Sequence, residues 1–187
     1  MPKVKWGHTI FNILSMPHML VEKDLRLRPL RDSDAAVLAS LANNKKIWDN
    51  LRDFFPHPYE ETDALFFIDL TKKEKPLLNF GIEFQGELCG VIGLTPQPDI
   101  YCKSAEIGYW LGEAYWNKGL ATRAIKLITD YGFETLQLVR IYTGIFEYNP
   151  GSMRALEKNG YEKDGVFKKS VFKNGQIWDE HRYSITR

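Results

Sequence analysis

The chain of 187 residues is long enough for one domain with a single core, and a composition of 44% hydrophobic and 26% charged residues excludes extensive disorder. Because 25 Lys and Arg side chains oppose 24 Asp and Glu side chains, no overall positive field would attract nucleic acid or an anionic membrane. Cys89, Cys102 and four scattered histidines lack the spacing of a metal site or a disulfide framework, so we expect a cytoplasmic protein that binds no metal.

Residues 1–24 are predicted to form a lead-in to the domain proper, residues 25–187. The apolar side chains of the lead-in, among them Trp6, Ile10 and Phe11, either form a short strand or cover a groove. Polar residues interrupt them, so the segment has neither the apolar core of a secretion signal nor the roughly 18 apolar residues of a membrane span. We therefore expect no membrane attachment.

The domain is predicted to open with a strand and two helices. Residues 25–30 alternate between apolar and mostly basic side chains, which is typical of a strand. Residues 32–34 supply a cap and early acids for a helix that runs to about Ala42. A second helix is expected from about residue 60 to residue 71.

An aromatic stretch, residues 43–59, connects these two helices. Trp48, Phe55 and Tyr59 are candidates for substrate binding, because exposed aromatic side chains on a connection can line a groove. The alternative is that they pack beneath the second helix. The sequence favours neither interpretation.

A β-hairpin and a further strand follow these helices. Residues 78–84 and 87–94 alternate on either side of Gln85-Gly86, which predicts two strands joined by a tight turn. Residues 104–111 form the next strand, and we expect it to run antiparallel to its predecessor.

The alternation within residues 104–111 separates two kinds of side chain. Glu106, Gly108 and Trp110 point to one face, and Ala105, Ile107, Tyr109 and Leu111 to the other. A carboxylate therefore shares its face with a glycine, which leaves space beside it.

The residues after this strand predict a binding site for an anion. Lys118 to Thr122 form the first turn of an amphipathic helix, with Gly119 at its start. A helix N-terminus offers unpaired N–H groups and a partial positive charge, and a glycine lets a phosphate approach the backbone. The helix should bury one apolar stripe against the sheet: Leu120, Ala124, Leu127, Ile128 and Tyr131. The next strand, residues 138–146, should then run parallel to residues 104–111.

The last third of the chain adds a short helix and a second hairpin. Asn149-Pro150 is a typical helix start, and Asn159-Gly160 a typical helix end. Residues 161–172 and 177–185 flank Asn174-Gly175, a favourable hairpin turn. Together the elements predict a single domain of the α/β (α+β) class, in which helices flank a mixed, mostly antiparallel twisted sheet.

Two motifs resemble a known family. The run AEIGYWLGEAYWNKGLATRAI, with the downstream residues 149–152 and 158–161, resembles the GNAT superfamily of acetyl-CoA-dependent N-acetyltransferases. The opening residues 25–30 and the loop that begins at Trp116 resemble more narrowly the branch of the ribosomal-protein N-terminal acetyltransferases. Trp116 departs from the superfamily pattern, which has Gln or Arg there.

The resemblance implies acetyl-CoA as cosubstrate. In the family, pyrophosphate lies on the loop and helix start and pantetheine runs along the preceding strand. Carried over to this sequence, the residues that bind the cosubstrate are Trp110, Leu111, Gly112, Asn117, Lys118, Gly119, Leu120, Ala121, Thr122, Asn149 and Ser152. The alternatives are a solvated charge for Lys118, a helix cap for Asn149 and an ordinary helix-start residue for Ser152.

The resemblance also implies catalytic residues. The attacking amine must lose a proton, because an ammonium has no lone pair for the thioester. Glu106 is the implied general base, and the alternative is a structural ion pair with a nearby Arg or Lys. A backbone N–H near Leu111 would hold the oxyanion. Leu156 stands where many members have a tyrosine acid, which leaves Ser152 as the nearest hydroxyl.

The predicted function is transfer of acetyl from acetyl-CoA to a primary amine, in a protein N-terminus or a small molecule, by direct attack in a ternary complex. Neither cysteine lies in a motif that would support an acyl-enzyme. Asp179 either orients the amine or is a buried structural acceptor. The competing hypothesis is a non-catalytic acyl-CoA-binding module. The identity of the amine and the choice between monomer and homodimer stay open.

Overall fold

A computed structural model describes residues 20–187, so the lead-in residues Trp6, Ile10 and Phe11 lie outside the described part of the chain. Within residues 20–187 the sheet has eight strands: β1 (Leu20–Glu22), β2 (Leu25–Arg28), β3 (Asn79–Phe84), β4 (Glu87–Pro96), β5 (Ser104–Leu111), β6 (Arg140–Phe146), β7 (Glu162–Lys173) and β8 (Gln176–Thr186). The same residues form five α-helices: α1 (Ala35–Ala42), α2 (Lys45–Trp48), α3 (Glu61–Thr71), α4 (Leu120–Glu134) and α5 (Pro150–Glu157). Three single 3-10 turns precede α1, β5 and α4: Asp32–Asp34, Asp99–Tyr101 and Glu113–Tyr115.

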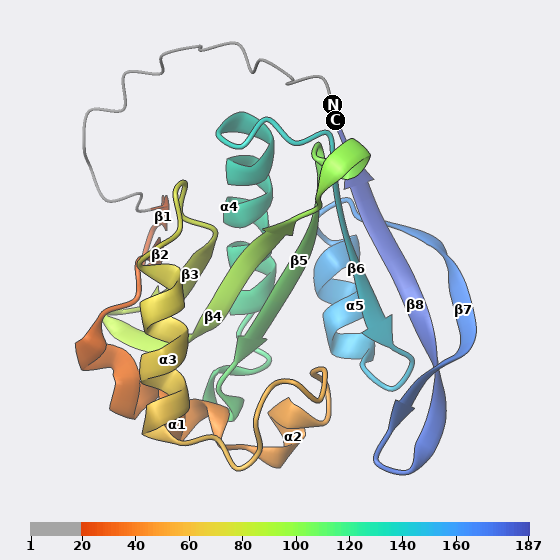
Figure 1. Cartoon of the computed structure of the whole chain (residues 1–187). Coiled ribbons are helices and arrows are strands. Elements are labelled where there is room, and N and C mark those ends of the chain that lie inside the picture. The colour runs from red at the N-terminus through yellow and green to blue at the C-terminus, as the bar shows by residue number, and fades with distance from the viewer. Residues whose placement is uncertain (1–19) are drawn as a thin grey trace, which may run out of the picture.

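The strands are ordered β1-β2-β3-β4-β5-β6-β8-β7 across the sheet. In the described residues every neighbouring pair is antiparallel except β5 and β6, which α4 connects as a crossover. The predicted single domain with a mixed, mostly antiparallel sheet is therefore confirmed. Figure 1 shows that the starts of α4 and α5 lie at the same end of the sheet as the ends of β5 and β6.

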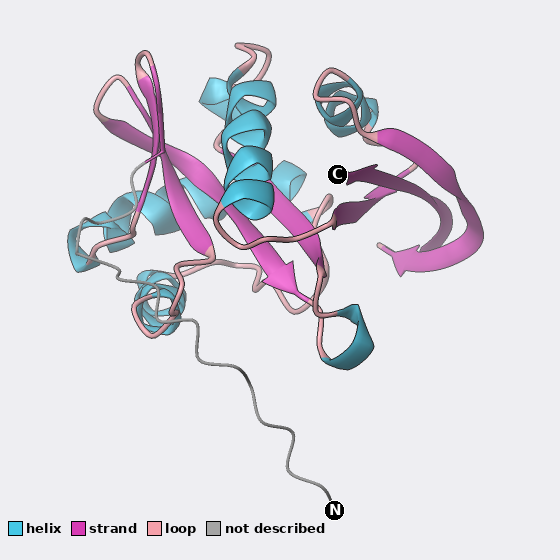
Figure 2. Cartoon of the chain, turned by 90° about the horizontal axis from the view of Figure 1, so that it is seen from above, coloured by secondary structure: helices cyan, strands magenta, loops and turns pink. Residues whose placement is uncertain are grey.

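Helices cover both faces of the sheet (Figure 2). On one face α4 and α5 pack against the larger core, and on the other α1 and α3 pack against a smaller apolar cluster that includes Leu88 and Val91 of β4. Trp110 packs against the smaller cluster, whereas Ala105 and Ile107 belong to the larger core. The predicted alternation of β5 is thus confirmed. We call the face under α1 and α3 the acceptor face.

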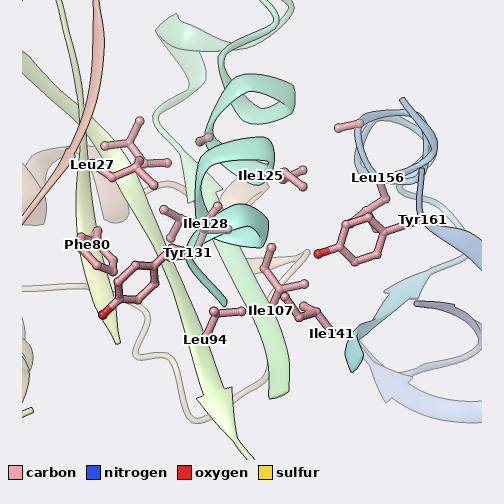
Figure 3. Packing of buried hydrophobic residues seen from close by; sticks show 14 of the residues in the cluster. Leu27, Phe80, Leu94, Ile107, Ile125, Ile128, Tyr131, Ile141, Leu156 and Tyr161 are labelled. Carbon is pink, nitrogen blue, oxygen red and sulfur yellow. The ribbon is translucent and has the colours of Figure 1, made fainter. Parts of the chain in front are cut away.

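The larger core joins α4 to the central strands. Figure 3 shows these side chains meeting between the helix and the sheet: Leu27, Phe80, Leu94, Ile107 and Ile141 from the strands, and Ile125, Ile128 and Tyr131 from α4. The predicted stripe on α4 is largely correct, but Leu127 is only half-buried. Ile125, which was not in the predicted stripe, is fully buried, because the contact surface is wider than one row of side chains.

Local turn chemistry explains where several elements begin and end. The two hairpin turns have positive φ at both central residues, 53° and 90° at Gln85-Gly86 and 53° and 73° at Asn174-Gly175, which suits the twist of the strands that they connect. The Asn149 side chain accepts the N–H of Ser152 and so caps α5.

Two elements were not predicted. The four-residue helix α2 lies inside the aromatic stretch, where the Asn44 side chain caps it by accepting the Lys46 N–H at 2.8 Å. The short strand β1 lies within the predicted lead-in and pairs with β2 at the edge of the sheet. Both are too short to leave a hydrophobic period in the sequence.

Candidate active site

The central feature of the site is the divergence of β5 and β6. These strands pair only from Ser104 to Glu106, and the register ends where Glu106 faces Tyr142. Beyond that point β5 continues to Leu111 against β4, and β6 continues to Phe146 against β8. We call the space between the two diverging strands the β5–β6 gap.

Main-chain groups of β5 point into this gap. The Gly112 N–H donates to the Cys89 carbonyl at 2.8 Å, and Gly90 stands opposite Leu111. Antiparallel pairing alternates along a strand, so the N–H and C=O groups of Leu111, and of Tyr109 two residues before, face away from β4. The Leu111 N–H is thus directed where the predicted oxyanion donor would be needed.

Trp116 anchors the loop after β5. Its indole Nε1 donates to the Leu111 carbonyl at 2.7 Å. The residue that departs from the superfamily pattern therefore ties the loop to the end of β5. This contact could not have been read from the motif, because the superfamily pattern has no indole at that position.

The helix of the predicted anion site begins at Leu120, two residues later than predicted. Gly119 is the N-cap of α4 with a left-handed φ of 74°, and a Cβ added there would meet no protein atom within 4 Å. Leu120 is buried in the larger core and fixes the helix start, whereas Asn117 and Lys118 are exposed. Lys118 lies over the Tyr115 ring, with its Nζ 5.5 Å from the centroid. The helix start is therefore open to a ligand, and we call residues 117–122 the anion cradle.

The predicted cosubstrate residues Trp110 and Gly112, at the end of β5, are held by contacts within the protein. A Cβ at Gly112 would lie 2.6 Å from the Leu41 Cδ2 atom, so packing of α1 requires a glycine there. The Trp110 ring stands edge-on to Phe55, with 6.1 Å between the centroids. Their main chains are paired as well: the Gly112 N–H donates to the Cys89 carbonyl, the Gly112 carbonyl accepts the Tyr115 N–H at 2.9 Å, and Trp110 lies opposite Val91 in the hydrogen-bonded register. Binding of the cosubstrate by these two residues stays a prediction.

Glu106 lies at the closed end of the β5–β6 gap, on the acceptor face. Its carboxylate forms an ion pair with Arg52 from the connection between α2 and α3. Arg52 is 56% exposed, whereas Glu106 is mostly buried. Burial and the nearby charge of Glu106 raise the pKa of Tyr142. The observed contact is the ion pair of the alternative interpretation, and the base role of Glu106 stays a prediction.

The three predicted substrate-binding aromatic residues have packing contacts. Tyr59 is only 6% exposed and belongs to the cluster under α1 and α3. Phe55 stacks on Tyr59 with 4.8 Å between the ring centroids. The Trp48 indole N–H donates to the Phe55 carbonyl at 3.0 Å, and its ring stacks on His57. The contacts of Phe55 and Tyr59 match the alternative in which the aromatic residues pack beneath the second helix, whereas Trp48 contacts its own connection.

A buried lysine fastens this aromatic connection to the β7–β8 hairpin. Lys173 is 2% exposed and places its Nζ 3.3 Å from the Trp48 ring centroid. The same Nζ donates to the Leu51 carbonyl at 3.0 Å and to Asp53 at 2.5 Å. We call these contacts the Lys173 clamp. It holds the connection that carries Arg52.

A pocket of about 350 Å³ lies next to the clamp. Its walls come from α2 and the residues after it, from the β7–β8 hairpin, and from Trp116 and Tyr148 near the ends of β5 and β6. The Tyr148 hydroxyl donates to the Asp49 carbonyl at 2.5 Å, and the Asn174 amide donates to the Asp49 carboxylate at 2.8 Å. None of Trp48, Phe55, Tyr59 and Asp179 lines this pocket.

The pocket residues were missed from the sequence for a physical reason. Asp49, Trp116, Tyr148 and Trp178 come from four separate segments, and only the three-dimensional fold brings them together. The available signal was the presence of large aromatic residues beside recognisable motifs, Trp116 in the loop and Tyr148 directly before the Asn149 cap. We call this cavity the acceptor-face pocket.

Asp179 has the contacts of a structural residue. Its carboxylate accepts the Lys169 N–H at 2.8 Å, where β7 is irregular and Lys169 has a φ of 55°. Its own N–H donates to the Glu147 carboxylate at 3.0 Å. A role in orienting an amine stays a prediction.

Ser152 and Asn149 lie in the first turn of α5. The Ser152 Oγ is 2.6 Å from the Tyr109 hydroxyl, which reaches it from β5. Leu156 is fully buried and lies beside Tyr161 in the larger core (Figure 3). The family position of a tyrosine acid is therefore filled by a core side chain, and a different tyrosine contacts the serine.

The remaining chemistry of the described residues is limited. Burial raises the pKa of the Cys89 thiol to about 12, and its Sγ donates to the Ile82 carbonyl. Among residues 20–187 no three His, Cys, Asp or Glu side chains are grouped as for a metal ion. No helix in this part of the chain has the length and hydrophobicity needed to cross a membrane.

Comparisons with known proteins are consistent with this geometry. The family profile described as "Acetyltransferase (GNAT) domain" matches residues 24–162. The chain is 33% identical over 177 residues to a probable N-acetyltransferase, YjcK of Bacillus subtilis, covering 88% of this chain and 94% of that protein. It is 32% identical over 164 residues to the spermidine N(1)-acetyltransferase of Escherichia coli K12, covering 86% and 85% of the two chains.

A solved structure extends the comparison to bound molecules. The spermidine N-acetyltransferase of Vibrio cholerae, crystallised with CoA and spermine, superposes with a TM-score of 0.74 at 28% identity, over 88% of this chain and 96% of that one.

Proposed function

This chain belongs to the GNAT acetyltransferase family, and we propose that it transfers acetyl from acetyl-CoA to a primary amine by direct attack. As a family member it is an acetyl-CoA-dependent N-acetyltransferase, with acetyl-CoA as its cosubstrate. The amine, the mechanism and the site residues are the parts that we propose.

The observation that carries the proposal is the arrangement around the β5–β6 gap. The anion cradle lies at the open end, where it supplies N–H groups and a helix dipole for the CoA pyrophosphate. Glu106 lies at the closed end, and further along β5 toward the open end Tyr109 and then Leu111 direct main-chain groups into the gap. The thioester would therefore lie between an anion site and a carboxylate.

Each residue has a role in the proposed reaction. Glu106 accepts the proton of the incoming ammonium, directly or through water, once Arg52 has moved aside. The freed amine attacks the thioester carbonyl, and the Leu111 N–H stabilises the oxyanion. The burial of Cys89 supports direct attack, because a thiol with a pKa of about 12 is a poor nucleophile near neutral pH.

We place the acceptor amine in the acceptor-face pocket. The pocket offers aromatic walls in Trp116, Tyr148 and Trp178 beside polar groups of Asp49 and Asn174. Aromatic faces attract ammonium groups, and the polar groups can orient the rest of the molecule. Spermidine is a reasoned first acceptor to test, since a relative 32% identical to this chain is a spermidine acetyltransferase. Peptides with free N-termini are the second class.

The test is thiol release from acetyl-CoA with a panel of amines, followed by mass spectrometry of the product. We expect acetylation of at least one amine and saturation by both substrates. CoA binding without transfer to any amine, peptide or protein would instead support the competing hypothesis, a non-catalytic acyl-CoA-binding module.

The variant Glu106→Gln tests the base. We expect kcat/KM to fall by about 100-fold or more, with unchanged affinity for CoA. Glu157→Gln is a matched control, because Glu157 is a carboxylate on the opposite face that only accepts the Tyr183 hydroxyl at 2.8 Å. A Glu106→Gln rate equal to wild type between about pH 6 and 9 would overturn the assignment.

A further inference from the structure

The hydrogen-bond donors in the walls of the acceptor-face pocket are largely used within the protein. The indole N–H groups of Trp116 and Trp178 donate to main-chain carbonyls at 2.7 and 3.3 Å. The Tyr148 hydroxyl donates to the Asp49 carbonyl at 2.5 Å, and burial and the nearby charges of Asp49 and Asp53 raise the pKa of this hydroxyl to about 12, so it keeps its hydrogen. Each of these three groups has a single hydrogen, so none has a second one to donate to a ligand.

The two amide side chains in the walls leave their oxygens free. The Asn50 Nδ2 donates to the Lys46 carbonyl at 2.9 Å, and the Asn174 Nδ2 donates to the Asp49 carboxylate at 2.8 Å. Because both partners can only accept, these contacts fix which end of each amide is the nitrogen. The Asn50 Oδ1 then lies buried with no hydrogen-bond partner within residues 20–187. A buried acceptor without a donor is costly, and a ligand that brings an N–H group would satisfy it.

Asp49 adds a charge with an unused oxygen. Its Oδ1 accepts from the Lys45 Nζ at 2.6 Å and from the Asn174 amide, whereas no hydrogen bond in the described part of the chain reaches its Oδ2. Burial raises the pKa of Asp49, but these hydrogen bonds outweigh it, so the net pKa lies below 3.8 and the carboxylate stays charged near neutral pH. The Lys46 ammonium, which also lies in the walls, pairs with Glu113.

An ammonium group is the ligand chemistry that fits these walls. It offers three N–H groups and no acceptor, and the aromatic surfaces of Trp116, Tyr148 and Trp178 attract it. An ammonium that pairs with Asp49 keeps its proton, however, because an adjacent carboxylate favours the charged form. It is therefore not the nitrogen that attacks the thioester, since that nitrogen needs a free lone pair. The reacting amine of the same molecule would lie toward the β5–β6 gap, which Trp116 borders through its contact with Leu111.

We propose that the acceptor-face pocket binds a second, non-reacting ammonium group of the acceptor through the Asp49 Oδ2 and the Asn50 Oδ1, so that diamines and longer polyamines are the preferred acceptors. The inference rests on the proposed acetyl transfer and names the class of acceptor within it. A volume of about 350 Å³ holds the ammonium together with part of an alkyl chain. A carboxylate in the same place would face the charge of Asp49 and find few free donors.

The test compares three series of acceptors, each taken through a range of chain lengths: α,ω-diamines, monoamines with a methyl group in place of the second ammonium, and amino acids with a carboxylate there. Putrescine, pentylamine and δ-aminovalerate form one matched set. At the best chain length we expect kcat/KM for the diamine to exceed that for the monoamine by about tenfold and that for the amino acid by about 100-fold. Equal values for diamine and monoamine at every length, or a preference for the amino acid, would overturn the proposal.

Asp49→Asn tests the pocket itself. The substitution keeps the shape of the side chain and an oxygen for the Asn174 amide, but it removes the charge. We expect KM for the diamine to rise by about tenfold, while kcat and the KM for the monoamine change less than about twofold. A loss of equal size for diamine and monoamine would mean that Asp49 supports the walls and binds no ammonium.

Asp130→Asn is the matched control for this variant. Asp130 also pairs with the lysine four positions before it, Lys126, at 2.7 Å against 2.6 Å for Lys45 and Asp49, but it lies on α4. We expect Asp130→Asn to keep the wild-type preference for the diamine. The same loss of preference in both variants would contradict the assignment of Asp49 to the pocket.

Calorimetry distinguishes a failure of this proposal from a failure of the proposed function. Binding of the same diamines and monoamines to the CoA-bound protein requires no turnover, and we expect Asp49→Asn to weaken only the diamines, by about tenfold. If no amine is acetylated but this difference holds, the proposed function fails and the pocket assignment stands. If diamines and monoamines are acetylated equally well, only the pocket assignment fails. Diamine binding that is absent, or equal in wild type and Asp49→Asn, also overturns that assignment.

Discussion

The anion cradle is one continuous stretch, residues 117–122, whereas the acceptor-face pocket takes its walls from segments between residues 46 and 178. In the proposed site the cradle would bind an anion through backbone groups, which any sequence supplies once Gly119 permits the turn. The pocket depends on particular side chains and on the Lys173 clamp that holds them. A cosubstrate common to a family can therefore be recognised by an almost fixed motif, while the acceptor site varies.

The two faces also differ in what stabilises them. On the α4 face the larger core is formed by apolar and aromatic side chains, and the buried polar residue of α4, Thr129, is an uncharged hydroxyl that pairs with Tyr161. On the acceptor face, close to α1, Arg28 is buried and forms a two-contact ion pair with Asp34, at 2.7 and 2.9 Å, and a further contact with Glu83 at 2.6 Å. The acceptor face therefore relies on paired charge as well as on apolar burial.

The largest effect should follow from Asp34→Ala, which breaks this ion pair. We expect a loss of about 3 kcal/mol in the free energy of unfolding, because the buried Arg28 keeps its charge with one partner fewer. Urea unfolding measures it. Asp32→Ala is the control, since Asp32 lies in the same turn but forms only exposed ion pairing with Lys72. Equal losses in the two variants would contradict the difference between the faces.

The stability that the Arg28–Asp34 ion pair contributes depends on pH, and the direction follows from the pKa of Asp34. Burial raises the pKa of Asp34, but hydrogen bonds from Arg28 and from the Arg31 N–H outweigh it, so the net pKa lies below its usual value of 3.8. The stabilisation is therefore complete above about pH 4 and is lost as the pH falls through the lowered folded-state pKa. Asp34→Ala should remove this part of the acid sensitivity.

A smaller effect, confined to the cosubstrate, is expected from Gly119→Ala. The methyl group occupies space that is open in the protein, and alanine disfavours the φ of 74°. We expect CoA affinity, measured by calorimetry, to weaken by about tenfold, with acceptor KM unchanged. Gly160→Ala carries the same backbone cost at a φ of 81° but lies at the end of α5. If both variants weaken CoA equally, the cradle is not the anion site.

The features that the sequence predicts correctly are those that depend on residues close together in the chain. The hairpin turns, the α5 cap and the glycine start of α4 depend on residues within a few positions of one another, and their turn chemistry is visible locally. The fold class followed from the periods of the strands and of α4. These parts were predicted correctly because short-range sterics and hydrogen bonding decide them.

The parts that were not predicted depend on distant contacts. Arg52 meets Glu106 across 54 positions, and Lys173 reaches Leu51 across 122. From the sequence alone, a lysine in a hairpin is expected to be solvated. Lys173 is buried because a carbonyl, a carboxylate and an aromatic ring from distant residues converge on it. The contact of Trp116 could not be predicted from the sequence either, since its partner is the main-chain carbonyl of Leu111.

The smallest predicted effect concerns the contact between the two regions, the Arg52–Glu106 ion pair. In the described structure the Arg52 guanidinium pairs with the Glu106 carboxylate, which in the proposed reaction accepts a proton from the acceptor's ammonium. Arg52→Gln removes this competitor, so we expect acceptor KM to fall by about two- to threefold, the modest scale of a half-exposed ion pair. KM for acetyl-CoA should stay the same, because the cradle is formed independently.

Arg26→Gln is a closely matched control for this prediction. Arg26 is 52% exposed and lies 3.8 Å from the mostly buried Glu83, so the two pairs have similar exposure. We expect no change in either KM for Arg26→Gln. If Arg52→Gln raises acceptor KM instead, Arg52 binds the acceptor, and an anionic group on that molecule becomes the simplest explanation. Either outcome assigns Arg52 to the acceptor face, whereas a change in KM for acetyl-CoA alone would mean that the two regions are not separable.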